Sequence, residues 1–167
     1  MKHFENISSE ELQTLENAVS QIAVLIAGAD GKIDKDETDW ASKLMHIRTY
    51  SGDKSMHDFY EQVEANFNIK LNDLIEHSSK NVAERQAALT ASIALVNPIL
   101  AKLDEETAYH VYHSYVTLAK SVAKAGGGIL GFGAISSAEE KLIGLPMITP
   151  IAKPANDLEI EEDEEAA

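Results

Sequence analysis

The sequence predicts an all-α fold of about seven helices in two pseudo-symmetric halves. Apolar residues recur at spacings of three and four, as on the buried face of a helix, and no stretch alternates at period two as a strand would. Capping residues mark the starts of several of these helices. A seven-residue pattern at 31–37 recurs at 133–139, which indicates two related helical units.

The first long helix begins at Ser8, which forms a capping box with Glu11 three residues later. Two shorter helices are expected further along the chain, over residues 55–67 and 69–77. The buried face of the first helix is one stripe of apolar side chains: Leu12, Leu15, Val19, Ile22 and Ile26.

A second apolar stripe contains Pro98, which must kink the helix or begin a new one with Asn97 as its cap. Asp104 is expected to cap the last long helix. The stripe around Pro98 is Leu89, Ile93, Val96, Leu100 and Leu103, and the last long helix buries Ala108, Val111, Tyr112, Tyr115, Leu118, Ala119 and Val122.

Charge and composition limit the function. The chain has 28 acidic and 14 basic residues, a balance that argues against nucleic-acid binding. It has no cysteine, which excludes disulfides, thiolate metal sites and thiol nucleophiles. No apolar run approaches the ~20 residues of a membrane span, so we expect one cytoplasmic domain over residues 1–152. Residues 153–167, acidic and preceded by prolines, are expected to be a disordered tail.

Each copy of the repeated pattern is expected to join two helices. The glycines Gly31 and Gly133 can adopt a positive φ that ends the incoming helix, and the isoleucines Ile33 and Ile135 can pin the loop to the core. The next residue in each copy caps the outgoing helix, and a glutamate three positions on completes a capping box. These pairs are Asp34 with Glu37 and Ser136 with Glu139.

The first junction also has part of the residue pattern of a calcium loop. With Glu37 as the last ligand of a twelve-residue EF-hand loop, the first and third positions are Ile26 and Gly28, which offer no side-chain oxygen. A standard EF-hand is therefore excluded. A looser cluster of carboxylates could still hold a hard cation with help from elsewhere in the fold: Asp30, Asp34, Asp36 and Glu37.

Residues 28–37, read as Gly-Ala-Asp-Gly-Lys-Ile-Asp-Lys-Asp-Glu after an apolar helix, resemble the signature of the TerB-like family of tellurite-resistance and stress proteins. A weaker second copy ends at Glu139, and the resemblance spans residues 8–148. It implies an all-α fold built from two related halves and a role in stress-related assemblies.

The resemblance also implies a divalent-metal site near the junctions. The second copy departs from the pattern, because Phe132 and Ser136 stand where the first copy has acids, which weakens that half as a metal site. The residues carried over are Asp30, Asp34 and Glu37 from the first copy, with Glu139 and Glu140 from the second.

Three other features have a functional and a structural interpretation. The glycines at 126–131 match a nucleotide-loop spacing, but they follow a helix rather than a strand. Glu106, His110 and His113 share a helix face that could bind zinc or could be a solvated polar face. Within the glycine-rich segment, an apolar trio either packs into the core or offers a patch to a partner: Ile129, Leu130 and Phe132.

We therefore expect a non-enzymatic, TerB-like interaction module with protein partners and with Ca²⁺ or Mg²⁺ as its candidate ion. The alternative is a divalent-cation sensor or buffer whose main role is ion binding. A purely structural role for the acidic junction, as a pair of helix caps, is left open. So is a weak homo-oligomer.

Overall fold

The structure of the chain is a computed structural model that describes residues 2–126 and 135–155. Within these residues every regular element is helical, which confirms the predicted all-α class. No helix in this part of the chain is both long and apolar enough to cross a membrane. The longer helices are α1 (Ser9–Ala27), α2 (Lys35–Arg48), α3 (His57–His77), α4 (Val82–Ile93) and α6 (Glu105–Ala125). The short ones are α5 (Asn97–Leu100) and α7 (Ser137–Glu140), with 3₁₀ turns η1 (Lys2–Phe4), η2 (Lys54–Met56) and η3 (Ala94–Val96).

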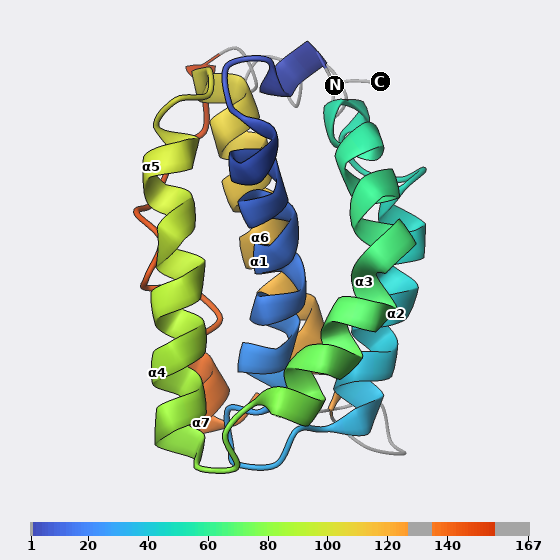
Figure 1. Cartoon of the computed structure of the whole chain (residues 1–167), viewed down its shortest axis with the longest axis vertical. Helices are drawn as coiled ribbons and strands as arrows, with labels where there is room; N and C mark the ends of the chain where they lie inside the picture. The colour runs from blue at the N-terminus through green and yellow to red at the C-terminus, as the bar shows by residue number, and fades with distance from the viewer. Residues whose placement is uncertain (1, 127–134, 156–167) are drawn as a thin grey trace, which may run out of the picture.

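Helix α1 lies in the centre of the bundle and packs against α2, α3, α4 and α6 (Figure 1). Its first half has the predicted stripe, but between Ala18 and Ala27 every residue except Gln21 is buried. The prediction of a single buried stripe is therefore wrong for the second half of α1. A helix that is apolar on all sides belongs in the interior, and the other helices cover it here.

Helix α3 is one helix where the sequence predicted two. Residues 55–67 and 69–77 are joined because Phe59, Val63, Phe67 and Leu71 are all buried and keep a spacing of four across the expected break. Asn68, between the two expected segments, is neither Gly nor Pro and does not interrupt the helix.

Pro98 begins a new helix, as one of the two predicted outcomes, but Asn97 is not its side-chain cap. Helix α4 gives way to η3, and Pro98 lies in the first turn of α5. The Asn97 amide instead donates to the Met147 carbonyl at 2.9 Å and accepts from the Thr149 N–H at 2.8 Å. Asn97 therefore ties the C-terminal segment, which runs back along the bundle, to the helical body (Figure 1).

The first junction departs from its predicted form in where α1 ends. The cap is Gly28 with φ −108°, and its N–H donates to the Val24 carbonyl at 3.1 Å. Gly31, three residues later, has the predicted positive φ, at 125°. Its conformation turns the chain toward α2 after the helix has already stopped.

Gly31→Val is expected to destabilise the fold by about 1–3 kcal/mol, because a β-branched residue is strained at positive φ. The space itself is open, since an added Cβ would meet only Val82 at 3.7 Å. Lys32→Ala, at the exposed neighbouring position, is the control and should change the free energy of unfolding little. Equal urea midpoints for the two variants would show that the positive φ of Gly31 is not needed.

Candidate functional site

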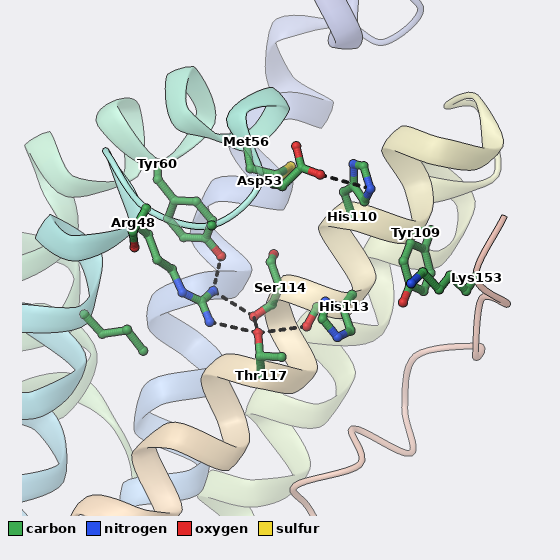
Figure 2. A pocket seen from close by; sticks show the side chains of 13 residues that line it. Arg48, Asp53, Met56, Tyr60, Tyr109, His110, His113, Ser114, Thr117 and Lys153 are labelled. Atoms are coloured by element: carbon green, nitrogen blue, oxygen red, sulfur yellow. Dashed lines mark hydrogen bonds and ion pairs between the residues drawn. The ribbon is translucent and has the colours of Figure 1, made fainter. Parts of the chain in front are cut away.

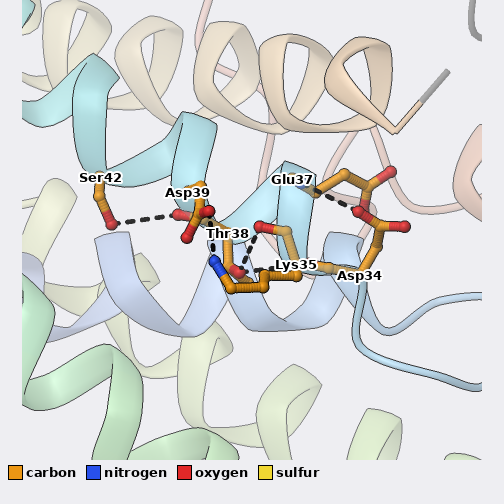
Figure 3. Close-up of polar contacts among 6 residues, drawn as sticks. All are labelled: Asp34, Lys35, Glu37, Thr38, Asp39 and Ser42. Carbon is orange, nitrogen blue, oxygen red and sulfur yellow. Dashed lines mark hydrogen bonds and ion pairs between the residues drawn. The ribbon is translucent and has the colours of Figure 1, made fainter. Parts of the chain in front are cut away.

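The first motif builds the N-terminal turn of α2 (Figure 3). The Asp34 carboxylate accepts a hydrogen bond from the Glu37 N–H at 3.1 Å, which confirms Asp34 as the N-cap. The Thr38 hydroxyl donates to the Asp34 and Lys35 carbonyls, and Lys35 pairs with Asp39 at 2.5 Å. The polar side chains of this turn are therefore mostly engaged with their own helix.

Glu37 does not complete the predicted capping box. In a capping box, the Glu37 side chain would accept a hydrogen bond from the Asp34 N–H. That N–H already donates to the Ala27 carbonyl at 2.8 Å. Glu37 is instead buried, with 6% of its surface exposed, and lies against Gly126 at the end of α6. A Cβ at position 126 would stand 2.1 Å from Glu37 Oε1, so a larger residue there would displace this carboxyl.

Glu37 meets Glu139 from the second motif. Glu139 is 7% exposed and forms the predicted capping box with Ser136, whose N–H donates to Glu139 Oε2 at 2.5 Å. The two carboxyls lie close enough for a hydrogen bond, which requires a proton on one of them. Corresponding positions of the two motifs thus supply a carboxyl pair inside the fold.

The proton belongs to Glu37. Burial raises the pKa of its carboxyl first, followed by the hydrogen bond and charge of Glu139 and the charges of Asp34 and Asp30, to about 8. A carboxyl surrounded by other carboxylates and removed from water disfavours its charged form. Near neutral pH Glu37 therefore keeps its proton and can donate it to a Glu139 oxygen.

The loop that precedes Asp34 is held by a residue that the sequence did not single out. Arg85 of α4 is 5% exposed, and its guanidinium donates to the carbonyls of Gly28 and Gly31, both at 2.8 Å, and of Ser79 at 3.1 Å. Gln86 donates to the Ala29 carbonyl at 3.0 Å. Helix α4 thus fixes the junction from a position more than fifty residues away.

The remaining predicted residues are placed as follows. Asp30, Asp36 and Glu140 are exposed, and only Asp30 is close enough to affect the pKa of Glu37. Ile33 and Ile135 pack against the core, as predicted. The described part of the chain contains no group of three His, Asp or Glu side chains arranged to hold a metal ion. The positions outside the described residues are Gly133 and the apolar trio Ile129, Leu130 and Phe132.

The histidines of α6 have partners other than the predicted zinc set. His110 Nε2 lies 3.2 Å from an Asp53 carboxylate oxygen, and its Nδ1 lies 3.1 Å from the Ser55 hydroxyl. His113 stacks on Tyr109, with ring centroids 5.5 Å apart. Glu106 is exposed on the same helix. His110 and His113 do line one pocket, described below, with Arg48 and Lys153.

Comparisons of the chain with protein-family models, curated proteins and solved structures found no match. The resemblance to the TerB-like family therefore rests on the residues of the two motifs alone. The chemistry of the junction follows from its geometry. Two buried carboxyls with further acids nearby can exchange a proton or hold a small cation in its place.

Proposed function

We propose that this chain is a non-enzymatic, TerB-like helical module that works through protein partners in a cytoplasmic stress-response assembly, and that its junction binds a divalent cation. The observation that carries the proposal is the contact between Glu37 and Glu139. The two residues occupy the same position in the two motifs, as expected if the two halves are related and meet at one site.

The donor chemistry fits a weak site for a hard cation. Glu37 and Glu139 would hold the ion, while Asp34 and Asp30 add negative charge. Two carboxylates offer at most four oxygens, fewer than the six to eight that Ca²⁺ takes, so affinity should be on the order of 10⁻⁴ to 10⁻³ M. The bound ion would supply the positive charge that the shared proton supplies in its absence.

Trp40 is the candidate contact through which cation binding at this site would affect a partner protein. The single tryptophan of the chain lies three residues after Glu37 on α2 and is 36% exposed. It lines a shallow pocket of about 490 Å³ with Asp36, Lys43 and Lys124. Exposed tryptophans often anchor protein interfaces, and a cation at the junction would fix the helical turn that carries this one.

The same carboxyl pair supports the alternative, a divalent-cation sensor or buffer whose main role is ion binding. The alternative is favoured if the cation binds and alters the protein without any partner.

Calcium or magnesium should raise the melting temperature at about pH 9, where the Glu37 carboxyl is ionised. At tenfold excess over the dissociation constant the added stability is RT ln 11, about 1.4 kcal/mol. The measurement is thermal unfolding at fixed ionic strength, with Trp40 fluorescence as a second signal from one turn away. Glu37→Gln should lose both responses.

Asp36→Asn is the matched control, because Asp36 is an exposed acid on the same helical turn and should keep the full response. If Glu37→Gln and the wild type gain equally from the metal, the ions only screen the acidic surface and the site does not exist.

A further inference from the structure

A polar pocket of about 760 Å³ lies at the C-terminal end of α2, whereas the junction lies at the N-terminal end of this helix; Figure 2 shows the pocket. Its walls come from the end of α2, the turn around η2, the start of α3 and one face of α6, with Lys153 of the C-terminal segment at its edge. This volume is typical of pockets that bind small organic molecules.

The lining reverses the charge balance of the chain. With histidines counted as neutral, the lining has two basic side chains, Arg48 and Lys153, and one carboxylate, Asp53; His110 and His113 lie beside them. The whole chain has twice as many acidic as basic residues. Because charges farther away than about 8 Å are largely screened at physiological ionic strength, the lining dominates the field that a ligand meets.

Hydrogen bonds fix the position of the Arg48 guanidinium in the pocket. Its guanidinium donates to the Ser114 carbonyl at 2.8 Å, the Thr117 hydroxyl at 2.9 Å and the Tyr60 hydroxyl, and it lies 5.0 Å from the centre of the Tyr60 ring. All these partners are neutral. Three of its five N–H donors are used, and within the described residues no carboxylate forms an ion pair with it.

The other basic side chains lie in the same space. The pKa of His113 is lowered by partial burial and then by the positive charges of His110, Lys120, Arg48 and Lys153. An anion placed among these groups would offset the repulsion between them. Leu44, Met56 and Tyr109 add apolar and aromatic surface beside the charged groups, which suits an organic ligand better than a bare ion.

We propose that this pocket binds a small organic molecule through a phosphate monoester group, with Arg48 as the main anchor and Lys153 and the His113 ring at its edge. A guanidinium matches the oxygens of a phosphate with parallel hydrogen bonds, and two of the Arg48 N–H donors remain for such contacts. The chemistry is that of a phosphate group, whether carried by a metabolite, a lipid or free in solution.

Calorimetric titration of the full chain with adenosine 5′-monophosphate, inorganic phosphate and vesicles containing phosphatidic acid separates these sources. We expect saturable binding of the monophosphate, weaker binding of inorganic phosphate and no binding to vesicles. Binding of vesicles alone, or of inorganic phosphate but not the monophosphate, would overturn the assignment to a small organic phosphate.

Arg48→Gln should weaken monophosphate binding by about tenfold or more, the usual scale for losing a charge-assisted hydrogen bond. Lys43→Gln removes the same charge from an exposed position on α2 outside this pocket and should leave the affinity unchanged. Because Arg48 also links α2 to α6, Lys153→Gln is the second test and should weaken binding about threefold without affecting those contacts. Wild-type affinity in both Arg48→Gln and Lys153→Gln would refute the site.

The pKa of His113, measured by NMR, reports directly on ligand binding in this pocket. Groups facing it come from α2 (Arg48), from α6 (Tyr109, His110 and Lys120) and from the C-terminal segment (Lys153), with Asp53 across the pocket. A bound anion favours the imidazolium form, so saturating monophosphate should raise the pKa of His113 in an NMR titration. An unchanged pKa would place the bound phosphate elsewhere.

Discussion

Arg85→Ala should lower the free energy of unfolding by about 3–5 kcal/mol, because the variant removes three hydrogen bonds of a charged donor and most of a buried side chain. Its guanidinium is 5% exposed and donates to three backbone carbonyls from two loops. Alanine would leave the Gly31 and Ser79 carbonyls without these donors, leave Gly28 with only the 3.3 Å hydrogen bond from the Gly31 N–H, and open a cavity beside Gly28. The measurement is urea unfolding at neutral pH, where the transition midpoint should fall sharply.

Two further variants make this test specific. Lys80→Ala removes an exposed basic residue from the same loop region and should change stability by less than about 0.5 kcal/mol. Arg85→Lys should recover only part of the loss, because one ammonium group cannot span the carbonyls that the planar guanidinium reaches. A loss below about 1 kcal/mol for Arg85→Ala would mean that water replaces the guanidinium and that Arg85 does not hold the junction.

The helix starts could be predicted because capping depends on residues three or four positions apart. Ser8 with Glu11, Ser136 with Glu139, and Asp104 all cap their helices as expected. The same reasoning was wrong for Glu37, because the Asp34 N–H is taken by the Ala27 carbonyl. That hydrogen bond belongs to the path of the loop, which local spacing does not specify.

The parts of the sites that were missed depend on contacts between distant residues. Arg85 reaches Gly28 and Gly31 across 57 and 54 residues, and no spacing in the sequence links them. His110 was identified with Glu106 and His113 on the same helix face, but its carboxylate partner, Asp53, comes from the turn before η2. Periodicity places residues on a face, whereas the packing of helices decides which faces meet.

Glu37→Gln should make the protein more stable in alkaline solution and flatten its stability–pH profile. In the unfolded chain this carboxyl ionises near 4.5, and in the fold its pKa is about 8. Between these values the folded state holds a proton that the unfolded state has released, so stability falls as the pH rises and levels off above the folded pKa. Each unit of raised pKa corresponds to about 1.4 kcal/mol, and partial relief by water and movement brings the expected loss to about 2–4 kcal/mol.

Glutamine keeps the size of Glu37 and can donate its amide N–H to Glu139, but it does not ionise. The variant should therefore match the wild type near pH 5 and exceed it by about 2–4 kcal/mol near pH 9, as measured by urea unfolding across the range. Glu140→Gln, an exposed acid beside Glu139, should leave the profile unchanged. Gly126→Ala should force the Glu37 carboxyl out toward water, which would weaken the pH dependence while lowering stability at acidic pH. A wild-type profile that is flat between pH 5 and 9 would show that the pKa of Glu37 is not raised in the folded protein, which would contradict a proton held by Glu37 at neutral pH.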